Sequence, residues 1–342
     1  MTERNLQLGL DFLYARLHGW WSRAAAGPVL DELSRSATEE NFFHLLQSRG
    51  VLSVTGPERV SEQLLLRQHA RLEELGAMAG GAYGEYCAVL CRALERENCK
   101  TVLNYRFFPE REAHLGDALI RFPHAAVREN DLLTLLDATT DDQFLRLFYQ
   151  ATGSEELTEI ARQLSEDHDL MRAECAVDNL SNQEELRAIG RLPGACRKVL
   201  MLLKGQQIDS QNITTALRNA SFYHLDAKGL SYAWGDGGLE FPRRVFDRLA
   251  LEGAKPEEVL QSIPAYYREL LGNETDVTRQ EHLLHCHIAR QARKFFYDSV
   301  EPWHAMAAYP VLLIQETVNL SRIYEGIRFN LPASDIAAMM IR

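Results

Sequence analysis

Histidines, cysteines and acids at helical spacing are the residues with which this chain could do chemistry. The densest group is His282-Leu-Leu-His285-Cys286-His287, in which His282 and Cys286 stand four residues apart and so share one face of a helix. Such a pair supplies two of the four ligands that zinc prefers. A third and a fourth ligand are not evident, and the HExxH motif is absent. A packed or solvated histidine helix is therefore favoured, and we predict no metal site.

Motifs for nucleophilic or nucleotide chemistry are also missing. The sequence has no GxSxG element, no Rossmann glycine pattern and no RNA-binding motif. The glycine-rich stretch 76–84 lacks a Gly-Lys-Ser/Thr group and a preceding strand, so we interpret it as a junction between helices. Cys87 and Cys91 lie on an apolar face and are expected in the core. We therefore predict no catalytic residues, no cofactor and no small-molecule substrate.

An acid followed three residues later by asparagine is the pattern that repeats. It occurs as Glu95…Asn98, as Asp209…Asn212 and as Glu316…Asn319. Each acid falls among the apolar positions of its own helix, where an ionised group is costly unless it is paired. The asparagines stand at positions 98, 212 and 319, so the copies are 114 and 107 residues apart. This spacing predicts an internal triplication, with modules at residues 1–121, 122–237 and 238–342.

Helical periodicity dominates the rest of the chain, and strand-like alternation is scarce. The segments Thr38-Glu39-Glu40-Asn41 and Thr139-Thr140-Asp141-Asp142 are expected to cap the helices that follow them. The C-terminal stretch 310–341 predicts one amphipathic helix, a break at Asn330-Leu331-Pro332 and a short second helix. The fold class predicted from the sequence is all-α.

Composition sets the limits on partners and compartment. The 342 residues carry a net charge of −11, which argues against nucleic-acid binding because such proteins present basic surfaces. The six cysteines form no CxxC pair, so reduced thiols in the cytosol are expected. The N-terminus has no signal-peptide pattern. The longest apolar run, 305–314, is about half of the ~20 residues that a membrane-spanning helix needs. A role at a membrane would therefore be played from outside it.

The three repeats resemble those of one known family, the central-stalk subunit called C in archaeal and bacterial V/A-type rotary ATPases and d in eukaryotic V-type enzymes. Its helices run acid-x-x-Asn-Leu-x-x-x-Leu-Arg. The second copy fits throughout, with Ile213 in place of the first leucine and with Leu217-Arg218 at the end. The first copy has Cys99 and Asn104 in place of the first leucine and the arginine, and the third has Tyr324-Glu325 in the last two places. Other similar segments are Tyr14-Ala15-Arg16, Tyr309-Pro310 and the glycine-bearing loop 234–240.

The resemblance implies a non-catalytic part. Three similar helical domains would form a pseudo-threefold funnel that receives the tip of the central stalk, subunits D and F. Its opposite face would rest on the membrane ring of proteolipid subunits, and torque for ion transport would pass between ring and stalk. The chain would then be cytoplasmic and peripheral, on the inner face of the membrane.

Two sets of residues follow from these arguments. Because the six signature residues are expected inside their helices, we predict that Glu95, Asn98, Asp209, Asn212, Glu316 and Asn319 form a structural clasp in each module. Each acid is expected to accept a hydrogen bond from a segment of its own module. The funnel implied by the resemblance places polar residues along the signature helices in the stalk socket, and the candidates are Arg218, Asn219, Arg322 and Glu325.

Two other functions are compatible with parts of the sequence. A helical scaffold unrelated to rotary ATPases would also have periodic helices, but solenoid repeats are about 34 to 47 residues long, whereas the period here exceeds 100. A metal hydrolase would have to use the histidine cluster at 282–287, and stoichiometric zinc in the purified protein would support it.

Overall fold

The computed structural model of the chain describes residues 3–36, 38–52, 59–108 and 118–342. These residues hold 17 α-helices and no β-strand, and 78% of the structure is helical, which confirms the predicted all-α class. The α-helices are α1 Glu3–Trp21, α2 Pro28–Ser34, α3 Glu39–Ser48, α4 Val60–Ala79, α5 Gly81–Phe107, α7 Glu129–Leu133, α8 Asp141–Thr152, α9 Glu155–Asp167, α10 Leu170–Gly190, α11 Gly194–Arg218, α12 Ala227–Leu230, α13 Arg243–Leu251, α14 Pro256–Ser262, α15 Ala265–Leu271, α16 Val277–Tyr297, α17 Pro302–Arg328 and α18 Ala333–Met339. Single turns of 3-10 helix cover Thr134–Asp137 and Ser231–Ala233, and a π-helical turn, η2, covers Asn219–Tyr223.

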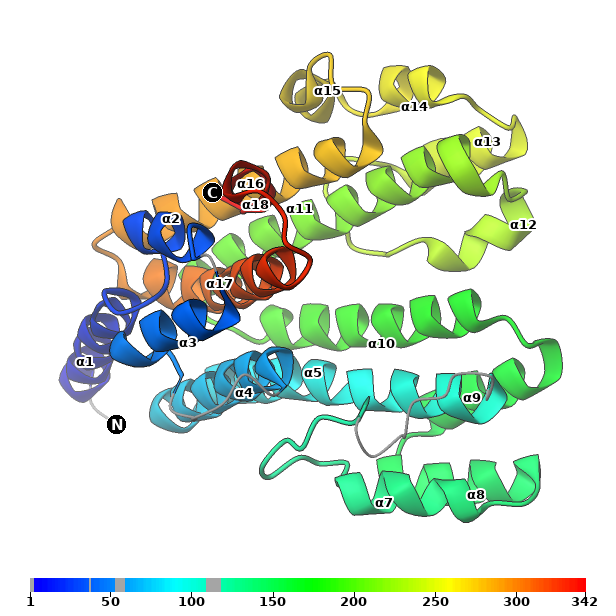
Figure 1. Cartoon of the computed structure of the whole chain (residues 1–342), viewed down its shortest axis with the longest axis horizontal. Helices are drawn as coiled ribbons and strands as arrows, with labels where there is room; N and C mark the ends of the chain where they lie inside the picture. The colour runs from blue at the N-terminus through cyan, green and yellow to red at the C-terminus, as the bar shows by residue number, and fades with distance from the viewer. Residues whose placement is uncertain (1–2, 37, 53–58, 109–117) are drawn as a thin grey trace.

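Six long helices form the frame of the molecule (Figure 1). They come as three consecutive pairs, α4 with α5, α10 with α11 and α16 with α17. Each pair also contacts the next, because α5 packs on α10, α11 on α16 and α17 on α4. The contacts therefore close a ring whose last step joins the C-terminal part of the chain to its N-terminal part. The second helix of each pair, α5, α11 or α17, carries one acid–asparagine signature.

Local sequence explains where several helices begin. Thr38 and Thr140 accept hydrogen bonds at their side chains from the backbone N–H groups of Asn41 and Gln143, at 3.2 Å each, so both predicted caps are confirmed. The stretch 76–84 is a helix junction, as predicted, in which α4 ends at Ala79 and α5 begins at Gly81. Gly80 has a φ of +60°, a conformation that glycine adopts without strain.

The C-terminal helix pair differs from its prediction at one end. The break at Asn330-Leu331-Pro332 separates α17 from α18 as expected, but α17 begins at Pro302 and continues through Pro310. Proline has no N–H, so it leaves the carbonyl four residues earlier without its helical partner. That carbonyl belongs to Met306, and the Tyr83 hydroxyl of α5 donates to it at 2.6 Å. A side chain from another helix pair thus satisfies the carbonyl group that Pro310 leaves unpaired.

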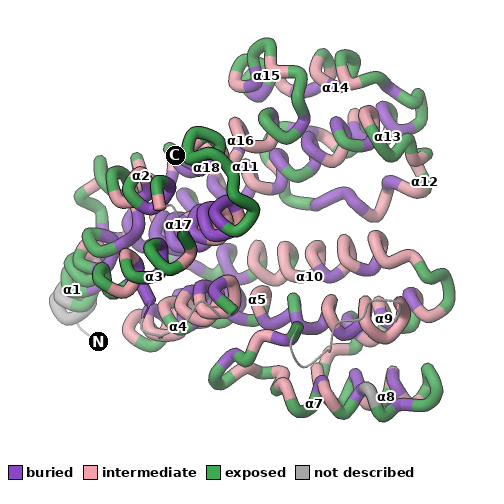
Figure 2. Tube along the Cα trace, in the orientation of Figure 1, coloured by how far each residue is buried: buried purple, intermediate pink, exposed green. Residues whose placement is uncertain are grey.

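The buried apolar residues form one central core and three peripheral ones. Figure 2 marks the buried residues along the chain in purple. The central core lies among α1 and the six frame helices. Each peripheral core contains the residues one, four and five places after a signature asparagine, and these are Cys99, Val102 and Leu103; Ile213, Ala216 and Leu217; Leu320, Ile323 and Tyr324. Each signature helix therefore serves the central core with its first half and a peripheral core with its second half.

The remaining residues of the peripheral cores come from short helices, from loops and from a second frame helix, which is α10, α16 or α4. The first core takes them from residues 119–177 and the second from 230–284. The third combines Ile336 and Met340 of the C-terminus with residues 25–64 of the N-terminal part, including Phe42 and Phe43 of α3. Each peripheral core thus contains residues from two of the predicted modules 1–121, 122–237 and 238–342. The module boundaries stay a prediction.

Candidate functional site

The three signature asparagines make the same contact. Each side chain donates from Nδ2 to the carbonyl of one residue and accepts at Oδ1 from the N–H of that same residue. The partners are Ile120 at 2.8 and 2.8 Å, Gly235 at 2.9 and 2.8 Å, and Ile341 at 2.9 and 2.7 Å. They follow their asparagines by 22, 23 and 22 residues. The side-chain amide thus satisfies both the N–H and the C=O of one residue, as a neighbouring β-strand would. It thereby fixes the position at which the segment after the helix packs back against it.

Asp209 is the most enclosed of the three acids, with no exposed surface. Its oxygens accept from the backbone N–H groups of Leu239, Glu240 and Phe241 at 3.0, 2.9 and 3.2 Å. The Tyr267 hydroxyl donates to Oδ2 at 3.0 Å. Burial, followed by the Asp209 charge, raises the pKa of Tyr267, so the phenol stays protonated and can donate.

The glycine-bearing loop after the second repeat owes one of its glycines to this contact. A Cβ added at Gly238 would lie 2.2 Å from Asp209 Oδ1, which is far inside van der Waals contact. Only glycine lets the backbone approach the carboxylate closely enough for the next three N–H groups to reach it. The loop therefore acts as a cradle for a carboxylate that the protein itself supplies.

Glu95 and Glu316 are held by fewer backbone groups and by a basic side chain. Glu95 accepts from Ala126 N–H at 3.0 Å and pairs with His69 Nε2 at 3.0 Å. Glu316 accepts from Ala25 N–H at 2.7 Å, and the two terminal nitrogens of Arg67 donate to its two oxygens at 3.0 and 3.1 Å. Such a two-point guanidinium contact is among the stronger ion pairs that proteins form.

All three acids are buried and hydrogen-bonded. With modules at 1–121, 122–237 and 238–342, His69 lies in the same range as Glu95, as expected, but the backbone groups bound by Glu95, Asp209 and Glu316 lie in another range. At those boundaries the expectation of bonding within one module is therefore wrong for Asp209 and Glu316. The reason is that each signature helix lies near the end of its range, and its returning loop comes about 30 residues later or, for Glu316, from the N-terminus.

The geometry of these carboxylates suits a structural role in joining segments of the chain rather than acid–base catalysis. An acid–base carboxylate needs a free oxygen facing substrate, whereas both oxygens of each of these acids are already bonded to protein donors. Three buried thiols are also unreactive, since burial raises the pKa of Cys91, Cys99 and Cys196 to about 12. Only the thiolate is a nucleophile, and it is scarce at neutral pH.

The histidine cluster lies on α16 and is divided among different neighbours. His282 Nε2 is 3.3 Å from Cys286 Sγ, while His287 contacts the Tyr266 hydroxyl. Burial lowers the pKa of His282, His285 and His287. Within the described ranges, no group of three or more histidine, cysteine, aspartate or glutamate side chains is placed to hold a metal ion.

The four socket candidates fall into two groups. Arg218 and Arg322 line one cleft between α11, α16 and α17. Asn219 is buried in η2, where its amide binds the N–H and C=O of Leu225 at 2.9 and 3.1 Å. Glu325 does not line that cleft and lies 3.7 Å from Arg328. The structure therefore brings together only the two arginines.

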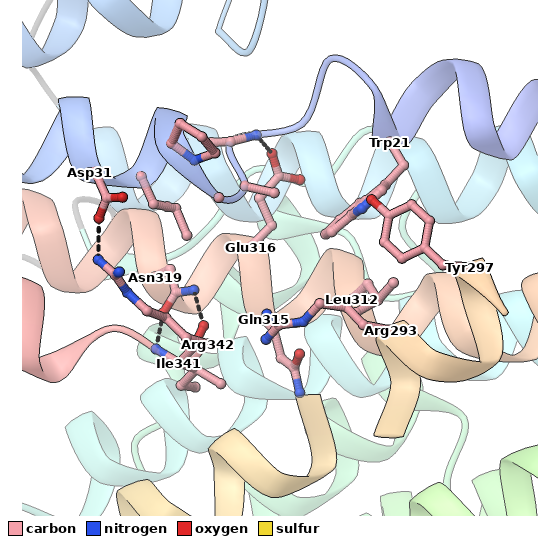
Figure 3. A pocket seen from close by; sticks show the side chains of 15 residues that line it. Trp21, Asp31, Arg293, Tyr297, Leu312, Gln315, Glu316, Asn319, Ile341 and Arg342 are labelled. Carbon is pink, nitrogen blue, oxygen red and sulfur yellow. Dashed lines mark hydrogen bonds and ion pairs between the residues drawn. The ribbon is translucent and has the colours of Figure 1, made fainter. Parts of the chain in front are cut away.

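A second cleft, of about 430 Å³, adjoins the third clasp (Figure 3). Asn319 and Ile341 form one wall and Trp21 and Tyr297 another, with Arg293 between them. The C-terminal residue Arg342 is paired with Asp31 of α2. Sequence reasoning missed this contact between the two ends of the chain, and it missed His69, Arg67 and Tyr267 as partners of the acids. The step from asparagine to partner is 22 or 23 residues in all three copies, but Ile120, Gly235 and Ile341 are not all of one residue type, so the sequence alone gives no signal for them.

Fold and site together define an all-α protein that repeats one helix-and-loop clasp three times, with a period of more than 100 residues. Sequence comparison then gives the family. The profile of the ATP synthase (C/AC39) subunit family matches residues 14–339. This chain therefore belongs to that family, the subunits C and d of V/A-type rotary ATPases. No curated protein matches the sequence closely enough to report. Along the described part of the chain, no helix is both long and apolar enough to span a bilayer.

Proposed function

We propose that this chain is a non-catalytic rotor subunit that joins the D–F central stalk to the membrane proteolipid ring and passes torque between them. The family match over residues 14–339 carries this proposal. The clasps support it, because a part that transmits torque must not shear where its helices meet its loops. In this role the chain is cytoplasmic and lies on the inner face of the membrane.

The proposal gives the three clasps a mechanical meaning. Each one ties the middle of a frame helix to a loop that leads into a peripheral core. Because an unsatisfied buried donor or acceptor costs about 1–3 kcal/mol, sliding one element past the other is opposed at three separate places. The three modules are proposed to surround a common axis, with the stalk at one end and the ring at the other.

Binding assays with the purified full chain test this function. We expect it to retain a purified D–F pair at low salt and to release part of it at high salt, because exposed charges are screened beyond a Debye length of about 10 Å at 0.1 M. We expect no ATP hydrolysis by the isolated chain. Hydrolysis, or failure to bind D–F even at low salt, would overturn the rotor assignment.

A further inference from the structure

The cleft that holds Arg218 and Arg322 has the composition of a binding site. It encloses about 420 Å³ and is formed by α11, α16 and α17, with Ile341 closing one side. Polar groups and aliphatic groups both line it, the latter including Ile208, Ile288 and Val318. It shares Gln315 and Ile341 with the cleft beside the third clasp.

Positive charge exceeds negative charge among the residues that line the open part of this cleft. Arg218 is 2.7 Å from Glu281. Arg322 donates from Nη1 to the Met339 carbonyl at 2.7 Å and lies within electrostatic range of Glu281. Glu281 is thus the single carboxylate that lines the cleft with these two guanidinium groups. Lys204 is matched by Glu185, at 2.5 Å. Burial lowers the pKa of Arg322, as expected for a cation whose surroundings do not fully compensate its charge. This excess occurs in a chain whose net charge is −11.

Two hydroxyl groups on the α11 side are buried without partners. Ser210 and Thr214 stand one helical turn apart, and they are 2% and 5% exposed. Neither Ser210 Oγ nor Thr214 Oγ1 has a hydrogen-bond partner among the described residues. Serine and threonine inside a helix commonly bond the carbonyl four residues back, and these two do not. The cleft also contains His285, whose Nδ1 has no partner among the described residues.

Buried polar groups without partners cost about 1–3 kcal/mol each, so a fold rarely keeps several of them together unless a ligand uses them. Here Ser210, Thr214, His285 and two arginines, which come from three different helices, line one cleft. Hydroxyl and guanidinium donors with an excess of positive charge match the oxygens of an anion.

We propose that this cleft is a binding site for an oxyanion, a phosphate or carboxylate group. Arg218 of α11 and Arg322 of α17 form ion pairs with the anion, and the hydroxyl groups of Ser210 and Thr214 on α11 donate hydrogen bonds to it. The aliphatic rim contacts whatever carries the charged group. The site goes beyond the proposed function, since it requires no other subunit. The group can arrive free in solution or on an acidic side chain of a partner protein, and the chemistry of recognition is the same.

Inorganic phosphate added to the full-length chain tests the site. Calorimetric titration and thermal melting are followed against phosphate concentration, with chloride adjusted to hold the ionic strength constant. We expect saturable binding that raises the melting temperature. The double variant Arg218→Gln/Arg322→Gln should lose at least about tenfold in affinity, as expected for two charge-assisted contacts. Absence of saturable binding to the wild-type chain would overturn the proposal.

Two further variants keep the test sharp if the arginine variant folds poorly. Ser210→Ala/Thr214→Val keeps the charge and nearly the shape, and it should weaken phosphate binding by about three- to tenfold through the lost hydrogen bonds. Arg293→Gln removes a cation from the neighbouring cleft and should bind phosphate like the wild type. Equal loss in Arg293→Gln, or no loss in the hydroxyl variant, would show general charge attraction and refute a built site.

Competition separates the two sources of the anion. If a partner's carboxylate is the natural occupant, phosphate should displace the purified D–F pair in the wild type but not in Ser210→Ala/Thr214→Val. If the free anion is the occupant, phosphate and D–F should bind together. Failure of D–F to bind under any condition would contradict the rotor assignment and leave the phosphate titration as the decisive result for the site.

Discussion

The second and third clasps solve the same problem with partners from different parts of the chain. Asp209 binds three backbone N–H groups that lie 30 to 32 residues ahead, and a tyrosine 58 residues ahead. Glu316 binds Arg67 and Ala25, which lie 249 and 291 residues away. The second clasp is thus local in sequence, whereas the third is completed by the opposite end of the chain.

This difference corresponds to the parts of the chain from which the peripheral cores are built. After α5 and after α11, short helices lead to the next long pair. The third peripheral core instead combines residues of α17 and α18 with residues of α2, α3 and α4. The C-terminal and N-terminal parts of the described chain therefore pack together to form this core. The Arg342–Asp31 ion pair ties them at the surface.

Removing the N-terminal part of the chain should cause the largest loss of stability, which appears as lost hydrogen-exchange protection in α17 and α18. A chain that lacks residues 1–58 loses eight buried apolar residues of the third peripheral core, which are Ala25, Leu30, Leu33, Phe42, Phe43, Leu46, Val51 and Leu52. It also loses the contribution of α1 and of the turn after it to the central core, which is Leu10, Leu13, Leu17, Trp20, Trp21 and Ala24. Burying a large apolar side chain contributes about 1.5–3 kcal/mol, so hydrogen exchange should show α17 and α18 unprotected beyond Leu320. A matched rearranged chain carries residues 1–58 after Arg342 through a flexible linker, which makes the third core contiguous in sequence, and protection should return. Full protection in the truncated chain would refute closure by the N-terminus.

The local clasp should be the most sensitive to a single substitution. Asp209→Ala leaves three N–H groups and one hydroxyl without their acceptor, and we expect a loss of about 3–5 kcal/mol in the free energy of unfolding. Denaturant melts followed by circular dichroism measure it. Glu252→Ala, at an exposed helix end, serves as the control and should change stability by less than about 0.5 kcal/mol. A variant that melts with the control would show that the carboxylate contributes nothing.

Substitution of Glu316 in the third clasp should lower the free energy of unfolding by less than substitution of Asp209, and a second substitution should recover part of the loss. Glu316→Ala leaves Arg67 unpaired, but that arginine side chain is 17% exposed and can reach water, so about 2–3 kcal/mol is expected. Adding Arg67→Met removes the stranded charge and should recover part of the loss in a double-mutant cycle. Tyr267→Phe should not rescue Asp209→Ala, because three backbone donors remain unsatisfied. If Tyr267→Phe recovers as much stability in Asp209→Ala as Arg67→Met recovers in Glu316→Ala, the two clasps do not differ in this way.

The helical class and the burial of the six signature residues could be predicted from the sequence, because both depend on periodicity and on the cost of burying charge. The partners of those residues could not. Gly238 and Tyr267 act through an approach between segments that only the folded chain creates, and nothing in their local pattern distinguishes them. Arg67 is one of two arginines on α4, the other being Arg71, and only packing decides which one meets Glu316.

The socket candidates show the same limit. Arg218 and Asn219 are neighbours in sequence, yet η2 turns the asparagine inward to bind Leu225 and leaves the arginine in the cleft. Helical periodicity continued past residue 218 cannot anticipate a π-helical turn, because that turn changes the angle per residue. The hydroxyls of Ser210 and Thr214 were overlooked because an isolated serine or threonine in a helix carries no sequence signal.

The smallest expected changes are in the rate at which Cys99 is alkylated, which tests whether the three peripheral cores open separately. Cys99 is buried in the first of these cores, with a pKa of about 12, so its thiolate is rare at pH 8 and alkylation requires local opening. Glu95→Ala breaks the clasp one helical turn away and should speed alkylation of Cys99 at least about tenfold, measured by peptide mass spectrometry. Glu316→Ala acts on the third core and should leave the rate within about twofold. If Glu316→Ala accelerates Cys99 as much as Glu95→Ala does, the cores open as one unit, and the contrast between a local and a long-range clasp has no consequence for dynamics.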